Sequence, residues 1–225
     1  MLKGLLLSFT CIFFAEYTMA IEEPKYTVIE ASEKFELRAY KPMIVAETRV
    51  GGDMDDAGTA GFKVIANYIF GNNTSSDTSS DTSSDTSSDT SSDTASESAK
   101  NKIKMTAPVS MKLESEQINM TAPVSMQAKD GQWLVHFVMP EKYTLSTLPT
   151  PNNPAVIIRE VPARNYAAIR FSGFAGPIKV DRKITELMVW LKDKGITPIS
   201  EPEMARYDAP WVLPFLRRNE IMVQY

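Results

Sequence analysis

The chain has 225 residues, of which 43% are hydrophobic and 23% charged, and its formal net charge is −4. This length is enough for one substantial hydrophobic core of ordinary domain size. The slight negative charge gives no support to nucleic-acid binding through a basic surface. Five aspartates in one low-complexity tract account for the acidity, and the rest of the chain is close to neutral.

The first twenty residues have the pattern of a secretory signal peptide. Lys3 precedes an apolar run, Leu5–Phe14, and small residues lead to a cleavage site after Ala20. The run is too short to span a bilayer, so an uncleaved anchor is the weaker interpretation. We expect a secreted or periplasmic chain that begins near Ile21 and keeps no stable membrane anchor. Because Cys11 is the only cysteine, this mature chain would contain no thiol.

The first elements of the mature chain are predicted to be strands followed by a helix. Alternating apolar and polar residues predict strands at Tyr26–Glu30, Phe35–Ala39 and Met43–Val50. A helix that Gly71 ends is predicted by apolar residues at helical spacing. These residues are Phe62, Ile65, Ala66 and Ile69.

A low-complexity tract follows the helix. Ser-Ser-Asp-Thr occurs five times in succession, Ser75–Thr94, with no apolar residue to bury. Such a tract cannot offset the entropy of ordering, so we predict a disordered surface insertion at about 71–100. A solenoid or calcium-binding repeat is the alternative, but the four-residue period has neither a hydrophobic position to stack nor the glycines of calcium-binding β-helix repeats.

The heptapeptide Met-Thr-Ala-Pro-Val-Ser-Met occurs twice, at Met105–Met111 and at Met120–Met126. Proline cannot donate to a sheet ladder, so each copy predicts extended backbone at a strand edge, start or bulge. Methionine is flexible and polarisable and suits an adaptable apolar surface, where we expect a ligand. A further strand is predicted at Gln132–Met139.

The second half of the chain repeats the pattern of the first after a shift of 121 residues. Leu37-Arg38 returns as Ile158-Arg159, and Val45-Ala46 returns as Tyr166-Ala167. A helix and a last strand within Trp211–Gln224 follow again. The fold class predicted is therefore α+β: one duplicated antiparallel sheet, forming a distorted β-barrel with two flanking helices, in a single domain over residues 21–225. The apolar face of the second helix comprises Val180, Ile184, Leu187 and Leu191, with Gly195 just past its end.

Five motifs, one of them present in two copies, stand in the family's order and resemble the SOUL heme-binding proteins over essentially the whole mature chain apart from the Ser/Asp/Thr insertion. The resemblance implies the same duplicated barrel, which is shared with gyrase-inhibitor-like ligand-binding domains. It also implies reversible binding of heme or another tetrapyrrole, without enzymatic turnover, in an apolar groove beside the first helix. The segments are Phe35–Tyr40, the two heptapeptides, Phe137–Leu148, Arg159–Gly173 and Ala205–Val223.

Carried over by position, the resemblance places the groove wall on the first helix. Tyr207 would approach from the loop before the last strand, and Lys63 or Arg206 would pair with the propionates at the rim. The alternative interpretation is that the apolar members simply pack on the sheet. The wall residues are Phe62, Lys63, Ile65, Ala66 and Ile69.

The iron of a bound heme has no evident ligand in this sequence. Some members of the family carry a histidine where Ala39 stands here. His136 is the only histidine, and histidine is the usual proximal ligand of heme. Alternation places it on the face opposite Val135 and Phe137, and a lone strand histidine is more often structural. Tyr207 and the heptapeptide methionines are comparably weak candidates, so we predict weak or absent axial ligation and no dedicated metal site.

Enzymatic functions find little support in the sequence. It contains no Gly-x-Ser-x-Gly elbow, no Gly-x-Gly-x-x-Gly, no Walker loop and no paired histidines for zinc. The leading prediction is a binding protein whose partner is a small-molecule tetrapyrrole. The alternative is a gyrase-inhibitor-like module for another amphipathic small molecule. The sequence leaves the oligomeric state open.

Overall fold

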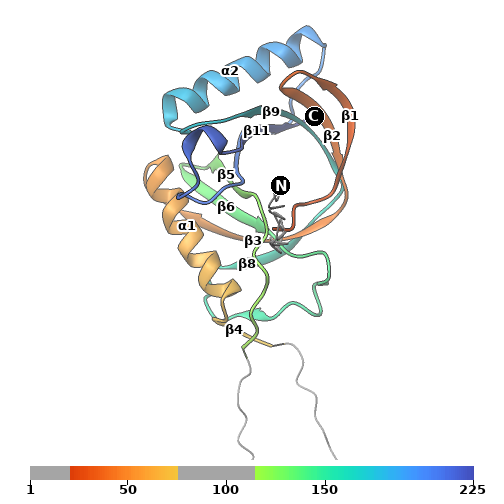
Figure 1. The fold of residues 1–225 in the computed structure, drawn as a ribbon. Coiled ribbons are helices and arrows are strands. Elements are labelled where there is room, and N and C mark those ends of the chain that lie inside the picture. The colour runs from red at the N-terminus through yellow and green to blue at the C-terminus, as the bar shows by residue number, and fades with distance from the viewer. Residues whose placement is uncertain (1–20, 76–114) are drawn as a thin grey trace, which may run out of the picture.

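The computed structural model describes residues 21–75 and 115–225 (Figure 1). The predicted signal peptide, most of the Ser/Asp/Thr insertion and the first heptapeptide, Met105–Met111, lie outside the described residues. One nine-stranded antiparallel sheet dominates the rest, in the order β1-β2-β9-β11-β10-β5-β6-β3-β8. These strands are β1 Tyr26–Ser32, β2 Phe35–Tyr40, β3 Met43–Val50, β5 Val124–Lys129, β6 Gln132–Val138, β8 Ile157–Val161, β9 Arg164–Phe171, β10 Glu203–Arg206 and β11 Asn219–Gln224.

Two helices lie on the outer face of the curved sheet (Figure 1). Helix α1, Met54–Ile69, packs on β6 and β3, and α2, Pro177–Asp193, packs on β9 and β11. The α+β prediction with two flanking helices is therefore confirmed. A 3-10 turn, η1 at Pro214–Leu216, lies in the loop between β10 and β11. No helix of the described part of the chain is long and apolar enough to cross a membrane.

The sheet is curved but not closed, so the predicted barrel is wrong on this point. Its edge strands are β1, paired only with β2, and β8, paired only with β3. Short bends connect β2 to β3 and β8 to β9. Each bend contains a proline, Pro42 in the first and Pro162 in the second. A proline cannot donate to a ladder. The pairing therefore changes partner at the two bends, and β8 keeps a free outer edge.

The strand order reflects the sequence duplication. The shift of 121 residues maps β2 onto β8, β3 onto β9 and α1 onto α2. The strand order from β2 to β8 has the symmetry of this duplication. When each strand is exchanged for its counterpart, including β5 with β10 and β6 with β11, the result is the same order read backwards. The two halves thus form one sheet with a shared core.

The second heptapeptide enters the interior of the sheet. Pro123 immediately precedes β5, as expected for a strand start, but β5 pairs with both β6 and β10. Of the predicted places for this proline, a strand edge, start or bulge, the structure confirms the strand start, and the strand itself lies inside the sheet. Met126 is buried beneath α1, where its sulfur would lie 3.5 Å from a Cβ at Gly58. Packing against the helix accounts for this methionine without a ligand.

The Ser/Asp/Thr insertion begins later than predicted. Asn73 and Thr74 form β4, which pairs with β7, Thr150–Pro151. The buried amide of Asn73 donates to the carbonyl oxygens of Tyr68 and Glu116, both at 2.8 Å. These bonds place residues 71–75 in the folded domain rather than in the insertion.

Candidate functional site

The apolar residues predicted to line a groove on α1 divide into two groups. Ile65 and Ile69 are fully buried against the sheet and Ala66 is nearly so, which is the packing that the alternative interpretation expects. Phe62 and Lys63 are exposed. The ring of Phe62 lies 5.7 Å from that of Phe137, which is buried on β6. The outer surface of α1 therefore offers one aromatic ring and one cation to a ligand.

Arg206 joins this surface from the end of β10. Its Nη2 atom lies 2.8 Å from Oδ1 of Asp55, in the first turn of α1. A Cβ at Gly58 would lie 3.6 Å from Nη1 of Arg206. Phe62 follows Gly58 after one helical turn, on the same side of the helix. The structure thus brings Arg206 and Phe62 to one side of α1.

Tyr207 lies on the other face of the sheet, as alternation along β10 requires. Its hydroxyl donates to Oε2 of Glu220 at 2.9 Å, and the Arg218 guanidinium lies 3.7 Å from the ring centroid. Burial and the neighbouring Glu220 carboxylate raise the pKa of Tyr207, so its hydroxyl stays protonated. Tyr207 belongs to the inner face and does not join Phe62 and Arg206.

The inner face is organised around a buried ion pair. Arg38 on β2 donates to both oxygens of Glu220 on β11, at 2.6 and 3.0 Å. Arg218 adds a bond to Oε1 of Glu220 at 2.9 Å. Burial alone raises the pKa of Glu220, but the bonds and charges of these two arginines outweigh it and hold that pKa below its usual value. The saturated carboxylate has a structural role.

His136 also faces the inner side of the sheet. Its Nε2 lies 3.5 Å from Oε1 of Glu203, and its Nδ1 is buried with no hydrogen-bond partner among the residues described. The neighbouring Phe137 packs on the outer face, beneath α1. A macrocycle bound against α1 would therefore have the sheet between its iron and His136. Within residues 21–75 and 115–225, no cluster of His, Cys, Asp and Glu could hold a metal ion.

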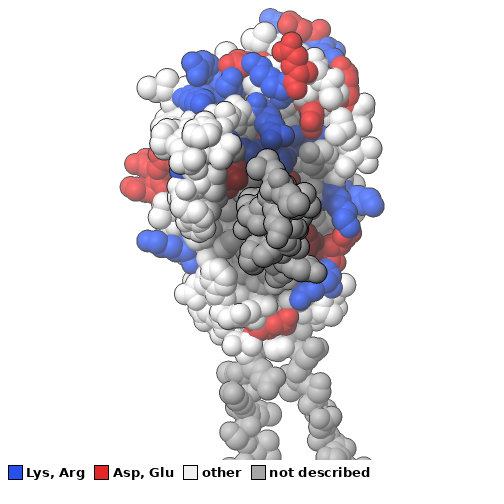
Figure 2. Space-filling model, viewed as in Figure 1, with Lys and Arg blue, Asp and Glu red and all other residues white. Residues whose placement is uncertain are grey.

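The loop between β10 and β11 carries a set of exposed apolar side chains that the sequence analysis did not assign to a site. Figure 2 shows an uncharged surface over this loop, with Lys and Arg side chains over the start of α2. The sequence signal for this surface is two prolines, Pro210 and Pro214, each followed by an aromatic residue. The exposed side chains are Trp211, Leu213, Phe215 and Leu216.

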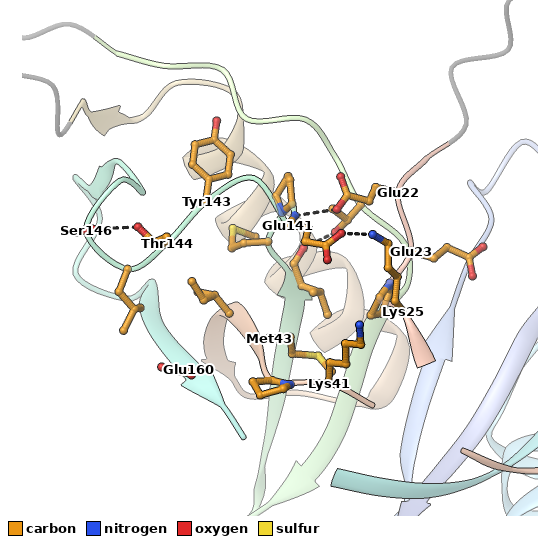
Figure 3. A pocket seen from close by; sticks show the side chains of 18 residues that line it. Glu22, Glu23, Lys25, Lys41, Met43, Glu141, Tyr143, Thr144, Ser146 and Glu160 are labelled. Carbon is orange, nitrogen blue, oxygen red and sulfur yellow. Dashed lines mark hydrogen bonds and ion pairs between the residues drawn. The ribbon is translucent and has the colours of Figure 1, made fainter. Parts of the chain in front are cut away.

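A cavity of about 520 Å³ lies between the segment before β1, the bend between β2 and β3, and the segment after β6. Its apolar lining comes mainly from the β2–β3 bend and from the segment after β6 (Figure 3). No residue of α1 lines it, so it is separate from the Phe62 surface. The apolar lining comprises Pro24, Pro42, Met43, Ile44, Val138, Met139, Pro140, Tyr143 and Leu145.

Charged side chains stand at one end of this cavity. Lys25 forms an ion pair with Glu141, and Oε1 of Glu22 accepts the Glu141 backbone N–H at 2.7 Å (Figure 3). Lys41 stands on the same side, and Glu160 lies at the opposite end. An apolar body with a polar or charged end fits this arrangement.

The fold and these surfaces define a sheet-dominated α+β domain that carries two helices on its outer face and an open, largely apolar cavity. The family model for SOUL heme-binding proteins matches residues 21–85 and 93–224. The chain belongs to the SOUL heme-binding protein family. A comparison with curated protein sequences finds no significant match.

Solved structures with the same fold share little sequence with this chain. The EcmrR C-terminal domain crystal structure has a TM-score of 0.53 at 11% identity, covering 88% of this chain and 96% of that one. A cryo-EM structure of an EcmrR–DNA complex gives 0.51 at 14% identity, covering 84% of this chain and 56% of that one. A crystal structure of a hydrolase from Listeria innocua gives 0.50 at 9% identity, covering 87% and 93%. At these identities the likeness concerns the fold alone.

Proposed function

We propose that the protein binds heme or a related tetrapyrrole reversibly, in a secreted or periplasmic setting and without enzymatic turnover. The observation that carries this proposal is the match to the SOUL family over nearly all of the chain after residue 20. Heme is a flat apolar molecule with two carboxylates, so its binding requires apolar surface and nearby cations. Its iron would supply any redox or ligand chemistry when bound.

The side chains on the outer surface of α1 suit the porphyrin ring and its propionates rather than the iron. Phe62 offers an exposed ring, and Lys63 and Arg206 are cations within reach of the same helix. His136 is on the inner face. The proposed mode is therefore apolar contact and propionate pairing, with weak or absent axial ligation.

A titration of the mature protein with protoporphyrin, followed by tryptophan quenching, tests this site. Phe62→Ala and Arg206→Met should each weaken binding by about tenfold, because each removes one contact worth on the order of 1.4 kcal/mol. Matched controls change an exposed ring and an exposed arginine away from α1: Phe174→Ala and Arg49→Met. If the controls weaken binding as much as the site variants, the assignment to α1 is wrong.

A second candidate function, binding of another amphipathic small molecule, is favoured by the 520 Å³ cavity. Its volume falls within the range of about 300–1,000 Å³ that is typical of ligand pockets. A thermal-shift screen of amphipathic compounds should yield ligands whose stabilisation is lost in Met43→Trp, which fills the cavity, and kept in Phe62→Ala. Ligands whose stabilisation is kept in Met43→Trp and lost in Phe62→Ala bind instead at the outer surface of α1.

A further inference from the structure

Six large apolar side chains are exposed to water around the β10–β11 loop and the start of α2. Trp211 and Ile178 are the most exposed of them, at 84% and 89%. Gly173 donates its N–H to the Pro214 carbonyl at 2.8 Å, which joins the loop to the segment before α2. Contiguous apolar surface of this kind marks an interaction site on a soluble protein. We call this set the loop patch; it comprises Phe174, Ile178, Trp211, Leu213, Phe215 and Leu216.

Arg217 holds the loop in this conformation. Its Nε donates to the Val212 carbonyl at 2.7 Å, its Nη2 donates to the Pro210 carbonyl, and its guanidinium lies 5.3 Å from the ring centroid of Phe174. The arginine thus satisfies the inward-facing carbonyls while the apolar side chains point into water. Because the loop is already ordered, a partner that buries these side chains does not incur the entropy cost of ordering it.

We propose that the loop patch is a peripheral docking surface for an anionic lipid membrane. Tryptophan and phenylalanine favour the membrane interface, where an apolar ring can insert below the headgroups. Three cations border the patch: Arg217 in the loop, and Lys179 and Arg182 on the first turns of α2, where Figure 2 shows basic side chains. Cations at this position attract anionic headgroups.

The shape of the surface favours a membrane over a folded partner. No residue of the loop patch lines the 520 Å³ cavity or the hollow between the start of β2 and the outer side of α2. A lipid interface needs no pocket, since it deforms around the inserted side chains. The contact is reversible and requires no spanning helix.

Co-sedimentation with vesicles tests this proposal, using the mature protein without any porphyrin so that the result is independent of the proposed function. We expect binding to vesicles of phosphatidylcholine and phosphatidylglycerol in equal parts, and weaker binding to phosphatidylcholine alone. Trp211→Ser combined with Phe215→Ser should weaken binding by about tenfold or more, because two inserted apolar side chains are lost. Ile199→Ser, which removes another exposed apolar side chain beyond the far end of α2, should have no effect.

Brominated phosphatidylcholine in the same vesicles provides a second readout. Quenching of tryptophan emission should be strong in the wild-type protein and in Ile199→Ser, and should be largely lost in Trp211→Phe, which retains an apolar side chain. Three results would overturn the proposal: no sedimentation with anionic vesicles, equal sedimentation of the double variant, or a concentration-dependent dimer that the double variant abolishes while vesicles remain unbound.

Discussion

Arg38 and Glu220 lie 182 positions apart and form two hydrogen bonds, at 2.6 and 3.0 Å, between side chains that are 2% and 0% exposed. The pair joins β2 to β11 across β9, which lies between them in the sheet. The duplication does not reproduce it. The shift of 121 residues places Arg159 at the position of Arg38, but Arg159 pairs with Glu47 at 2.7 Å. The inner faces of the two halves have therefore diverged.

Removal of one partner of this pair should be strongly destabilising. Arg38→Met leaves the buried Glu220 with Arg218 as its remaining cation, and Glu220→Gln leaves the buried Arg38 with Glu36 as its remaining ion-pair partner. Each should lower the free energy of unfolding by about 3–5 kcal/mol. In the double variant the losses should not add, with a coupling of about 1–3 kcal/mol. Urea unfolding followed by circular dichroism measures all three values.

The exposed ion pair between Lys25 and Glu141 provides the control for this cycle. Both side chains are more than half exposed. Lys25→Met should therefore leave the urea midpoint almost unchanged. Additive losses in the Arg38 and Glu220 cycle would show that the two side chains do not stabilise the fold as a unit.

The stability should fall in acid because carboxylates of the folded protein have lowered pKa values. Hydrogen bonds from Lys34 and Lys183 lower the pKa of Glu186 to about 2, from an ordinary value of 4.5. A carboxylate with a lowered pKa stabilises the fold fully above its unfolded pKa and loses that contribution as the pH falls through the folded pKa. The contribution of Glu186 is therefore lost between about pH 4.5 and 2.

Urea unfolding of Glu186→Gln across this pH range measures the effect. The variant should be less stable than the wild-type protein at neutral pH, and the difference should shrink as the pH falls towards 2. A difference that is constant over the whole range would contradict the lowered pKa. Glu220 should add to the acid loss in the wild-type protein, since its pKa is also lowered.

Gly61 allows α1 to approach β6 closely, and a larger residue there should be destabilising. A Cβ at this position would lie 2.6 Å from the Cβ and Cγ2 atoms of Val135, which is fully buried. Gly61→Ala should cost about 1–3 kcal/mol through overpacking, although alanine favours the helix. Val135→Ala in the same chain should recover part of the loss. Thermal unfolding of the single and double variants measures both effects.

Gly58, three residues earlier on α1, is the matched control. The nearest atom to a Cβ there is the Met126 sulfur at 3.5 Å, an ordinary van der Waals contact. Gly58→Ala should therefore be neutral or stabilising, by up to about 1 kcal/mol, from helix propensity. If both glycine variants change the stability in the same direction, close packing at Gly61 is not the reason for the effect.

The sequence predicts the elements of this fold well because their periodicity is strong. The spacing of Phe62, Ile65, Ala66 and Ile69 coincides with α1, and the shift of 121 residues correctly relates the two halves. Closure of the sheet could not be predicted, because it depends on which partner each strand takes beyond the bends at Pro42 and Pro162. Periodicity describes a single strand and carries no information about its neighbours.

The candidate site was harder to predict than the fold. Apolar spacing on α1 does not distinguish Ile65, which is buried, from Phe62, which is exposed, because both satisfy the helical pattern. Arg206 and Tyr207 were placed together, whereas adjacent residues at the end of a strand point to opposite faces. The Arg38–Glu220 pair gave no local signal, since its partners come from strands at the two ends of the chain.

In the proposed binding mode, the protein contacts the porphyrin ring and its propionates and provides no strong ligand for the iron. Equilibrium titrations of the mature protein with heme and with metal-free protoporphyrin, followed by the Soret band and tryptophan quenching, compare the two dissociation constants directly. The two dissociation constants should lie within about threefold of each other, since an iron ligand would add well over 1 kcal/mol to the binding of heme alone. A dissociation constant for heme that is lower by about a hundredfold would contradict it, as would the absence of binding to either porphyrin.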